Sequence, residues 1–165
     1  MKTAVYVLVA LAAAAGGFAI YRFGIAPSEM PPAAQTMAVT PATERAMPAT
    51  LPEFSLLDRE GELRAISSWP GRSMIVNFWA TWCAPCRREI PLLNELQRTH
   101  GEAGFQVVGV AMDIREDVLA YADEIGIDYP ILIGEQEALD AINLFGLESV
   151  GFPFTVFTDD QARIV

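Results

Sequence analysis

Residues 73–101 constrain the fold more than any other part of the chain, because an apolar run passes there directly into a helical pattern. Residues 73–79 include β-branched side chains, which is typical of a buried central strand. From Cys86 onward, apolar residues recur every three or four positions at Ile90, Leu93 and Leu96. Gly101 follows as a candidate C-cap. The sequence therefore predicts a strand followed at once by a helix.

Strand and helix patterns alternate along the rest of the domain. Further strands are expected at 105–111, 130–133 and 154–157, and helices at 116–125 and 136–145. This order predicts an α/β fold, with a largely parallel sheet covered by helices and right-handed crossovers. Residues 54–57 and 62–64 flank a turn-prone segment and predict an N-terminal hairpin. A second turn is expected at 159–162, leading into residues 163–165.

The chain contains only two cysteines, Cys83 and Cys86, separated by Ala84 and Pro85. Two cysteines cannot form a scaffold of several disulfides. A structural zinc site needs two further ligands, and the single histidine, His100, lies at the far end of the predicted helix. We therefore expect no metal and no cofactor beyond the redox-active pair itself.

The predicted helix places its two cysteines in different environments. Cys83 is expected to be exposed at the helix start, where unpaired backbone N–H groups and the helix dipole favour a thiolate. Cys86 lies one turn inside and is expected to be the more buried thiol. Cys83 is therefore the candidate nucleophile for a substrate disulfide, and Cys86 the candidate resolving thiol. Pro85 suits the first helical turn, where its missing N–H costs nothing.

The N-terminal residues 1–22 have the pattern of a membrane segment. The 19 residues from Thr3 to Tyr21 are uncharged and lie between Lys2 and Arg22. A length near 20 residues and an interfacial tyrosine favour a retained signal anchor. A cleaved leader is the alternative, because Ala13-Ala14-Ala15 offers small residues to a peptidase. The anchor places the rest of the chain outside the cytoplasmic membrane.

A linker and an acidic domain follow the membrane segment. Residues 23–50 contain five prolines and show no apolar period, which predicts a linker. Residues 51–165 then form the single predicted domain. The formal net charge of the chain is −10, which argues against nucleic acid as a partner because such a surface repels phosphate.

The motif Trp79-Ala80-Thr81-Trp82-Cys83-Ala84-Pro85-Cys86 resembles the active-site signature of thioredoxins. Residues 51–56 and the insert at 113–129 resemble the membrane-tethered TlpA, ResA and CcmG branch. This resemblance implies a thioredoxin-like fold and a thiol-disulfide oxidoreductase acting on protein disulfides or dithiols. It also implies a periplasmic location, an upstream membrane electron donor and, in several members, a role in cytochrome c maturation.

The resemblance also implies several site residues. Pro153, in Gly151-Phe152-Pro153-Phe154, corresponds to a cis-proline opposite the cysteines. We expect Trp82, Pro85, Phe152 and Pro153 to contact substrate. Phe154 departs from the family's frequent threonine after the proline.

Two further departures concern a proton acceptor and the end of the domain. Asn77 replaces the buried acidic residue of thioredoxins, and an amide cannot accept that proton. Glu89 resembles the carboxylate that replaces it in the tethered branch, although a solvated glutamate paired with Arg87 or Arg88 is the alternative. The family continues through a last strand and helix, so we expect both to be missing after Val165.

Two rival functions use the same cysteine pair. An oxidase would donate its disulfide to folding proteins, and the reduction potential separates it from a reductant. Apolar Ala84 brings no cationic donor that could stabilise a thiolate at the pair, and this favours the reductant. A copper-binding assembly factor would need a methionine or histidine near the thiols. His100 lies too far along the predicted helix, and Met74 and Met112 are more simply core residues.

Overall fold

The computed structural model describes residues 47–146 and 151–165. The expected membrane segment at 1–22, and all of the expected linker except residues 47–50, lie outside these ranges. The strands are β1 (Ser55–Leu57), β2 (Leu63–Ala65), β3 (Ser73–Trp79), β4 (Phe105–Met112), β5 (Ile131–Gly134) and β6 (Phe154–Phe157). The helices are the 3-10 helix η1 (Ile66–Ser68), α2 (Ala84–His100), α3 (Arg115–Ile125) and α4 (Gln136–Asn143). No helix within the described residues is both long and apolar enough to cross a bilayer.

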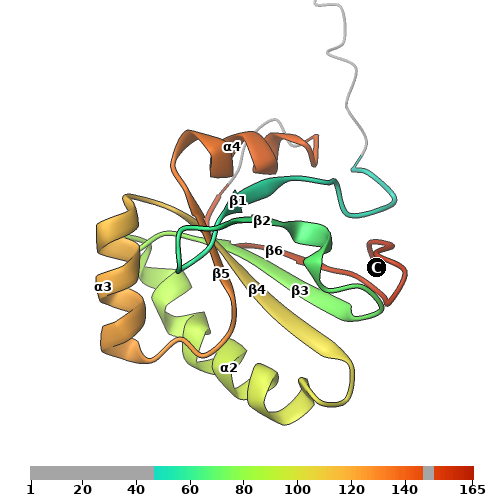
Figure 1. Ribbon diagram of the computed structural model, residues 1–165, viewed down its shortest axis with the longest axis horizontal. Coiled ribbons are helices and arrows are strands. Elements are labelled where there is room, and N and C mark those ends of the chain that lie inside the picture. The colour runs from blue at the N-terminus through green and yellow to red at the C-terminus, as the bar shows by residue number, and fades with distance from the viewer. Residues whose placement is uncertain (1–46, 147–150) are drawn as a thin grey trace, which may run out of the picture. The chain divides into compact units, whose positions relative to one another are not determined.

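The six described strands form one mixed sheet in the order β2-β1-β5-β4-β3-β6 (Figure 1). The central strands β3, β4 and β5 are parallel, while β6 and the β1–β2 hairpin pair antiparallel at the two sides. The parallel strands are joined through α2 and α3, as strand–helix alternation predicts. The predicted α/β fold with a central mixed sheet and an N-terminal hairpin is confirmed.

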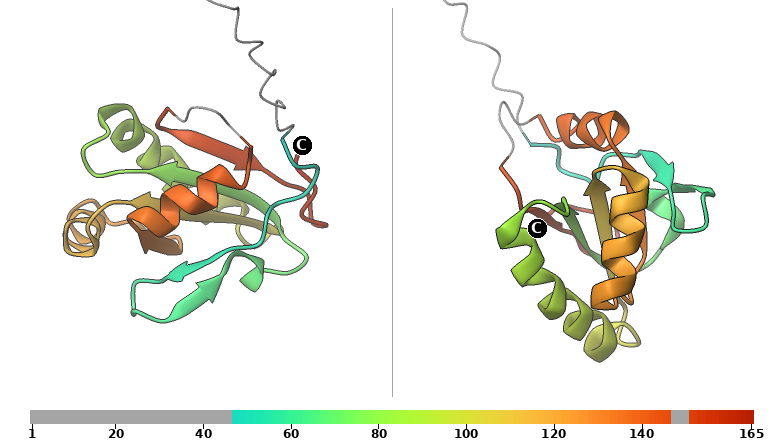
Figure 2. Two further views of the ribbon diagram at one scale, coloured as in Figure 1. Left: turned by 90° about the horizontal axis from the view of Figure 1, so that it is seen from above. Right: turned by 90° about the vertical axis from the view of Figure 1, so that its left-hand side faces the viewer.

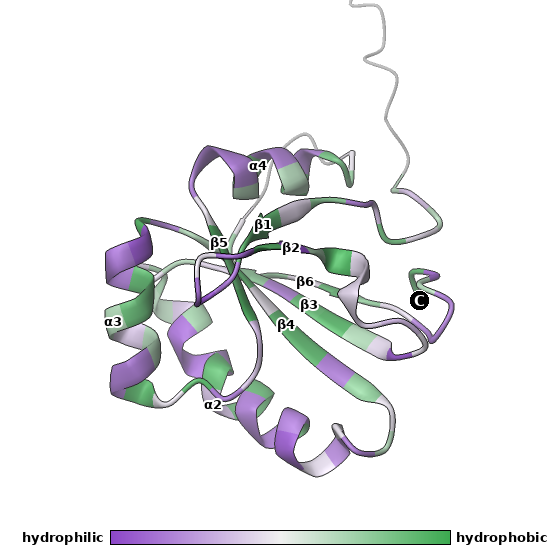
Figure 3. Ribbon diagram, viewed as in Figure 1, coloured by the Kyte–Doolittle hydropathy of each residue, from purple (hydrophilic) through white to green (hydrophobic). Residues whose placement is uncertain are grey.

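The sheet separates two apolar cores. α2 and α3 cover one face and α4 covers the other (Figures 1 and 2). Alternate residues of β3 divide between the faces, so that Trp79 packs under α2 and α3 while Phe78 packs under α4. Figure 3 shows the central strands as mostly hydrophobic and the helices as mixed. Burial on both faces explains why these strands read as near-continuous apolar runs.

The element boundaries agree with the sequence patterns to within a few residues. β3 has the predicted bounds, and Gly126 ends α3 with a left-handed φ of 70°. α4 ends at Asn143, two residues before the predicted end. The 3-10 helix η1 was not predicted.

The chain after β6 turns back on itself as predicted. The turn at 159–162 is closed by a hydrogen bond from the Ala162 N–H to the Asp159 carbonyl, 3.1 Å long. Thr158 then forms an isolated antiparallel bridge with Ile164. β6 itself is an outer strand of the described sheet.

The N-terminal hairpin is held together by the buried Asp58. Its carboxylate accepts hydrogen bonds from the backbone N–H groups of Glu60 (3.1 Å) and Glu62 (2.9 Å) and pairs with Arg64 (2.8 Å). Arg115, the first residue of α3, donates to the carbonyl oxygens of Asp58 and Arg59. The hairpin is thereby attached to the helix that follows β4.

The Asp58→Asn variant should lose stability in a pH-dependent way. Burial alone would raise the pKa of Asp58, but the backbone N–H of Glu62, the Arg64 side chain and the backbone N–H of Glu60 hold that pKa below its ordinary value of 3.8. The carboxylate therefore stabilises the fold above about pH 4, and this stabilisation is lost as the pH falls through the lower folded-state pKa.

Denaturant unfolding at neutral and acidic pH measures this effect. The difference in unfolding free energy between wild type and Asp58→Asn should be largest near neutral pH and should shrink in acid. The exposed Asp160→Asn is the matched control. A difference that stays constant with pH would contradict the role given to the carboxylate.

Candidate active site

Cys83 is the N-cap residue of α2. Its backbone is extended (φ −83°, ψ 99°), and its sulfur accepts a hydrogen bond from the Cys86 backbone N–H at 3.3 Å. Pro85 lies in the first turn, where the helix has no use for its N–H. The Cys86 N–H of the first turn therefore points at the Cys83 sulfur, and the positive end of the helix dipole lies there as well.

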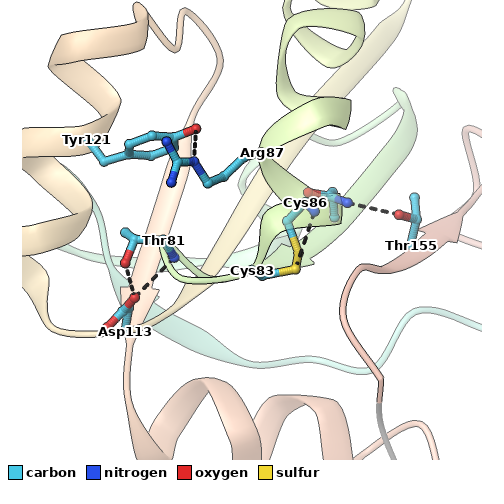
Figure 4. The surroundings of a disulfide bond; sticks show 8 residues. Thr81, Cys83, Cys86, Arg87, Asp113, Tyr121 and Thr155 are labelled. Atoms are coloured by element: carbon cyan, nitrogen blue, oxygen red, sulfur yellow. Dashed lines mark hydrogen bonds between the residues drawn. A yellow bond between two sulfur atoms is a disulfide. The ribbon is translucent and has the colours of Figure 1, made fainter.

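The two cysteines are joined in a disulfide with their Cα atoms 5.3 Å apart (Figure 4). Cys86 is 1% exposed and Cys83 is 5% exposed, so Cys86 is the more buried residue, as expected. The expectation that Cys83 is itself exposed is wrong for the disulfide form. Its neighbours Trp82, Ala84 and Pro85 are the exposed residues at this end of the helix.

Thr81 and Asp113 fasten the loop that carries Cys83. The Asp113 carboxylate accepts hydrogen bonds from the Thr81 N–H, at 3.0 Å, and from the Thr81 hydroxyl (Figure 4). Asp113 directly follows β4, and parallel strands end at the same edge of a sheet, so the carboxyl ends of β3 and β4 meet here. Sequence reasoning missed this contact, although the strand pattern placed both residues at strand ends.

Arg87 connects the start of α2 to α3. Its guanidinium lies 5.0 Å from the centre of the Tyr121 ring, and its Nε donates to the Tyr121 hydroxyl at 3.3 Å. The Tyr121 ring in turn lies 5.9 Å from the ring of Trp79. This contact holds the first turn of α2 against α3, and sequence reasoning did not find it.

The Phe152–Pro153 peptide bond is cis, which is the isomer that the resemblance implies. Phe152 packs against the buried cluster that contains both cysteines. Its ring meets the exposed ring of Trp82 edge to face, with centroids 6.0 Å apart. The structure thus brings Trp82 together with Phe152 and the adjoining cis-proline Pro153 next to the cluster of the cysteines, and the substrate contacts of these residues stay a prediction.

Three buried polar atoms have no hydrogen-bond partner among the described residues. They are Asn77 Oδ1, Trp79 Nε1 and the Tyr129 hydroxyl. The Asn77 amide nitrogen does have a partner, since it donates to the Thr155 hydroxyl at 2.9 Å. Burial, and then the nearby Asp128 and Tyr121, raise the pKa of Tyr129, so its hydroxyl stays protonated.

Glu89 lies on α2 three residues beyond Cys86 and is half-buried. Residues three apart share a helix face, so Glu89 follows Cys86 along the same side. Within the described residues it forms no ion pair with Arg87 or Arg88, which was the alternative interpretation. No hydrogen bond joins it to either cysteine in the disulfide form.

The residues that a copper site would need lie away from the thiols. Met74 and Met112 pack in the core on the α4 side of the sheet, while both cysteines belong to the other core. His100 is the last residue of α2, and its ring contacts Phe105. These positions argue against a copper site built from the two thiols and any of these residues.

Comparisons with known proteins agree on the family. The profile of the AhpC/TSA family matches residues 48–165. Thiol-disulfide oxidoreductase ResA of Geobacillus thermodenitrificans is 31% identical over 126 residues, which cover 76% of this chain and 70% of that protein. ResA of Geobacillus kaustophilus is 34% identical over 127 residues, which cover 76% of this chain and 70% of that protein.

Solved structures give the same assignment. A thiol:disulfide interchange protein of the thioredoxin family from Chlorobium tepidum is similar with a TM-score of 0.63 and 33% identity, over 73% of this chain and 84% of that one. A secreted thiol-disulfide isomerase from Corynebacterium glutamicum is similar with a TM-score of 0.63 and 27% identity. The match covers 69% of this chain and 72% of that one. With the cysteine pair placed at the start of α2, the chain belongs to the AhpC/TSA family and is a ResA-like thiol-disulfide oxidoreductase of the thioredoxin superfamily.

Proposed function

We propose that this protein reduces disulfides of proteins outside the cytoplasmic membrane. The observation that carries the proposed chemistry is the hydrogen bond from the Cys86 N–H to the Cys83 sulfur, because in the reduced protein the same N–H stabilises a Cys83 thiolate, the form that attacks disulfides. The reducing direction rests on Ala84, which adds no cationic or hydrogen-bonding side chain that would stabilise the reduced pair. Cys86 is nearly inaccessible and is suited to a reaction inside the protein.

The reaction exchanges one disulfide for another. The Cys83 thiolate attacks a sulfur of the client disulfide, the client S–S bond breaks, and the departing client sulfur takes up a proton. Cys86 then loses its proton and attacks Cys83, which releases the second client sulfur and forms the 83–86 disulfide. The client gains two electrons and two protons, and an upstream dithiol donor must return the pair to the reduced state.

Glu89 is the proposed acceptor for the proton that Cys86 loses. Asn77 cannot take this proton because it is an amide. Glu89 is half-buried on the helix face of Cys86, and no cation among the described residues pairs with it. A carboxylate in that position is within one helical turn of the thiol that must be deprotonated.

The client is proposed to dock over the rim formed by Trp82, Pro85, Phe152 and Pro153. Trp82 is 65% exposed, and its ring is held edge to face by Phe152. A rigid aromatic surface beside a nucleophile provides contact area with little loss of side-chain entropy. The cis-proline loop leads directly into β6, so its position is set by the sheet.

The place of action follows from the N-terminal residues. We propose that residues 1–22 anchor the chain in the cytoplasmic membrane and that residues 23–50 link this anchor to the domain. The resemblance to the tethered branch supports a role in cytochrome c maturation and an upstream membrane electron donor. Release of the protein from membranes by alkaline carbonate would contradict the anchor.

Equilibration with glutathione buffers tests the reducing direction. Ala84 supplies no cationic or hydrogen-bonding side chain to the Cys83 thiolate, so the reduced pair receives no extra stabilisation from the residues between the cysteines. We expect a reduction potential nearer that of thioredoxin, about −270 mV, than that of DsbA, about −120 mV. A value near the DsbA end would instead assign the protein as an oxidase.

The Glu89→Gln variant tests the proton acceptor. Disulfide exchange should slow by roughly 10²-fold or less, the low end for losing a positioned acid or base, while stability changes little. Stopped-flow exchange with a model disulfide measures the rate. Glu95→Gln, an exposed change on the same helix, is the control. An unchanged rate in Glu89→Gln would place this carboxylate among the solvated residues.

A further inference from the structure

Asn77 carries a buried hydrogen-bond acceptor that pairs with none of the described residues in the disulfide form. Asn77 is 1% exposed, and its Oδ1 has no partner among the described residues. Its Nδ2 donates to the Thr155 hydroxyl on β6, and the amide oxygen is left without a donor among the described residues. A buried acceptor without a donor destabilises the fold, so this oxygen calls for an explanation.

The free oxygen lies on the side of the sheet that faces the cysteines. Asn77 stands on β3 between Ile75 and Trp79, which both pack in the cluster that contains Cys86. Side chains alternate along a strand, so Asn77 points to the same face. Figure 4 shows Thr155, the partner of Asn77, in the immediate surroundings of the disulfide.

Reduction gives Cys86 a proton that the disulfide form lacks. When a water-soluble phosphine reduces the bond, phosphorus loses two electrons and takes an oxygen atom from water to become the phosphine oxide. The two hydrogens of that water supply the protons of the two thiols, and the S–S bond is broken. Cys86 is then a thiol donor at a position that is 1% exposed, where solvent offers no acceptor.

We propose that Asn77 Oδ1 accepts a hydrogen bond from the Cys86 thiol in the reduced protein, and that Thr155 holds the amide in place for it. The bond exists only after reduction, so it stabilises the dithiol form relative to the disulfide. Asn77 is thus a positioning residue that adjusts the redox equilibrium of the pair. This inference holds for either direction of electron flow, because it concerns the dithiol form alone.

Tyr129 is the competing acceptor on this side of the sheet. Its hydroxyl is also buried and unpartnered among the described residues. Tyr129 precedes β5, which is two strands away from β3 in the sheet, and its ring packs beside Gly109, the residue opposite Asn77 on β4. Asn77 is proposed first because β3 leads through a short loop into α2, which carries Cys86 in its first turn.

Infrared spectroscopy of the S–H stretch tests the proposal. The protein is reduced with a phosphine, which has no S–H band, and Cys83→Ser isolates the signal of Cys86. The Cys86 band should lie at the lower frequency of a hydrogen-bonded thiol, and Asn77→Leu, which is nearly equal in size, should move it to the frequency of a free thiol. Thr155→Val should broaden the band by releasing the amide.

The glutathione equilibrium of the dithiol protein gives a second measurement. Loss of one neutral hydrogen bond in Asn77→Leu should shift the equilibrium about 3- to 10-fold toward the disulfide. Thr158→Val is the control, because it removes another side-chain hydrogen bond between β3 and the chain after β6 and should leave the equilibrium unchanged.

Each outcome decides the matter. A Cys86 band that stays at the same frequency in Asn77→Leu overturns the proposal, and movement of that band in Tyr129→Phe would assign the acceptor to Tyr129 instead. An equilibrium that shifts equally in Thr158→Val would show a general effect of weakening the strand pair, which also overturns it. None of these measurements uses a client protein, so they are independent of the proposed direction of electron flow.

Discussion

The hydrogen bond from the Cys86 N–H to the Cys83 sulfur joins the reactive group to the first turn of α2. This bond exists because β3 ends at Trp79 and leaves a short loop before α2 begins. The sulfur therefore occupies the position of an N-cap acceptor, which in most helices is an oxygen. This capping arrangement sets the position of the Cys83 sulfur and provides electrostatic support for its thiolate. It also sets the spacing between Cys83 and Cys86.

The rest of the domain holds that helix end in place from several sides. Asp113 fastens Thr81 from the end of β4, and Arg87 lies against Tyr121 of α3. Phe152, which precedes the cis-proline, packs against the core that contains the cysteines. These supports come from two segments far apart in the sequence, the one that follows β4 and the one that precedes β6, so the geometry of the site depends on the α/β topology. Such support is what a preorganised nucleophile requires.

The sequence was sufficient to predict the order of elements and the position of Cys83 and Cys86. Strand β3 and helix α2 were predictable because a strand buried on both faces leaves a continuous apolar run, while a helix buried on one face leaves apolar residues every three or four positions. The contacts of Asp113 with Thr81 and of Arg87 with Tyr121 were not, because they join residues more than 30 positions apart. The cis bond before Pro153 was expected from the resemblance alone, since local sequence favours trans. Burial of Cys83 was missed because a helix start is usually exposed, whereas here the surrounding core covers it.

Peptide mapping after brief alkylation of the reduced protein tests most directly whether the α2 N-terminus makes Cys83 the nucleophile. Iodoacetamide near neutral pH, at limiting time, should label Cys83 well before Cys86, because the capping N–H groups favour its thiolate and Cys86 lies deeper in the core. Faster labelling of Cys86 would contradict the account and reverse the attacking and resolving roles of the two thiols.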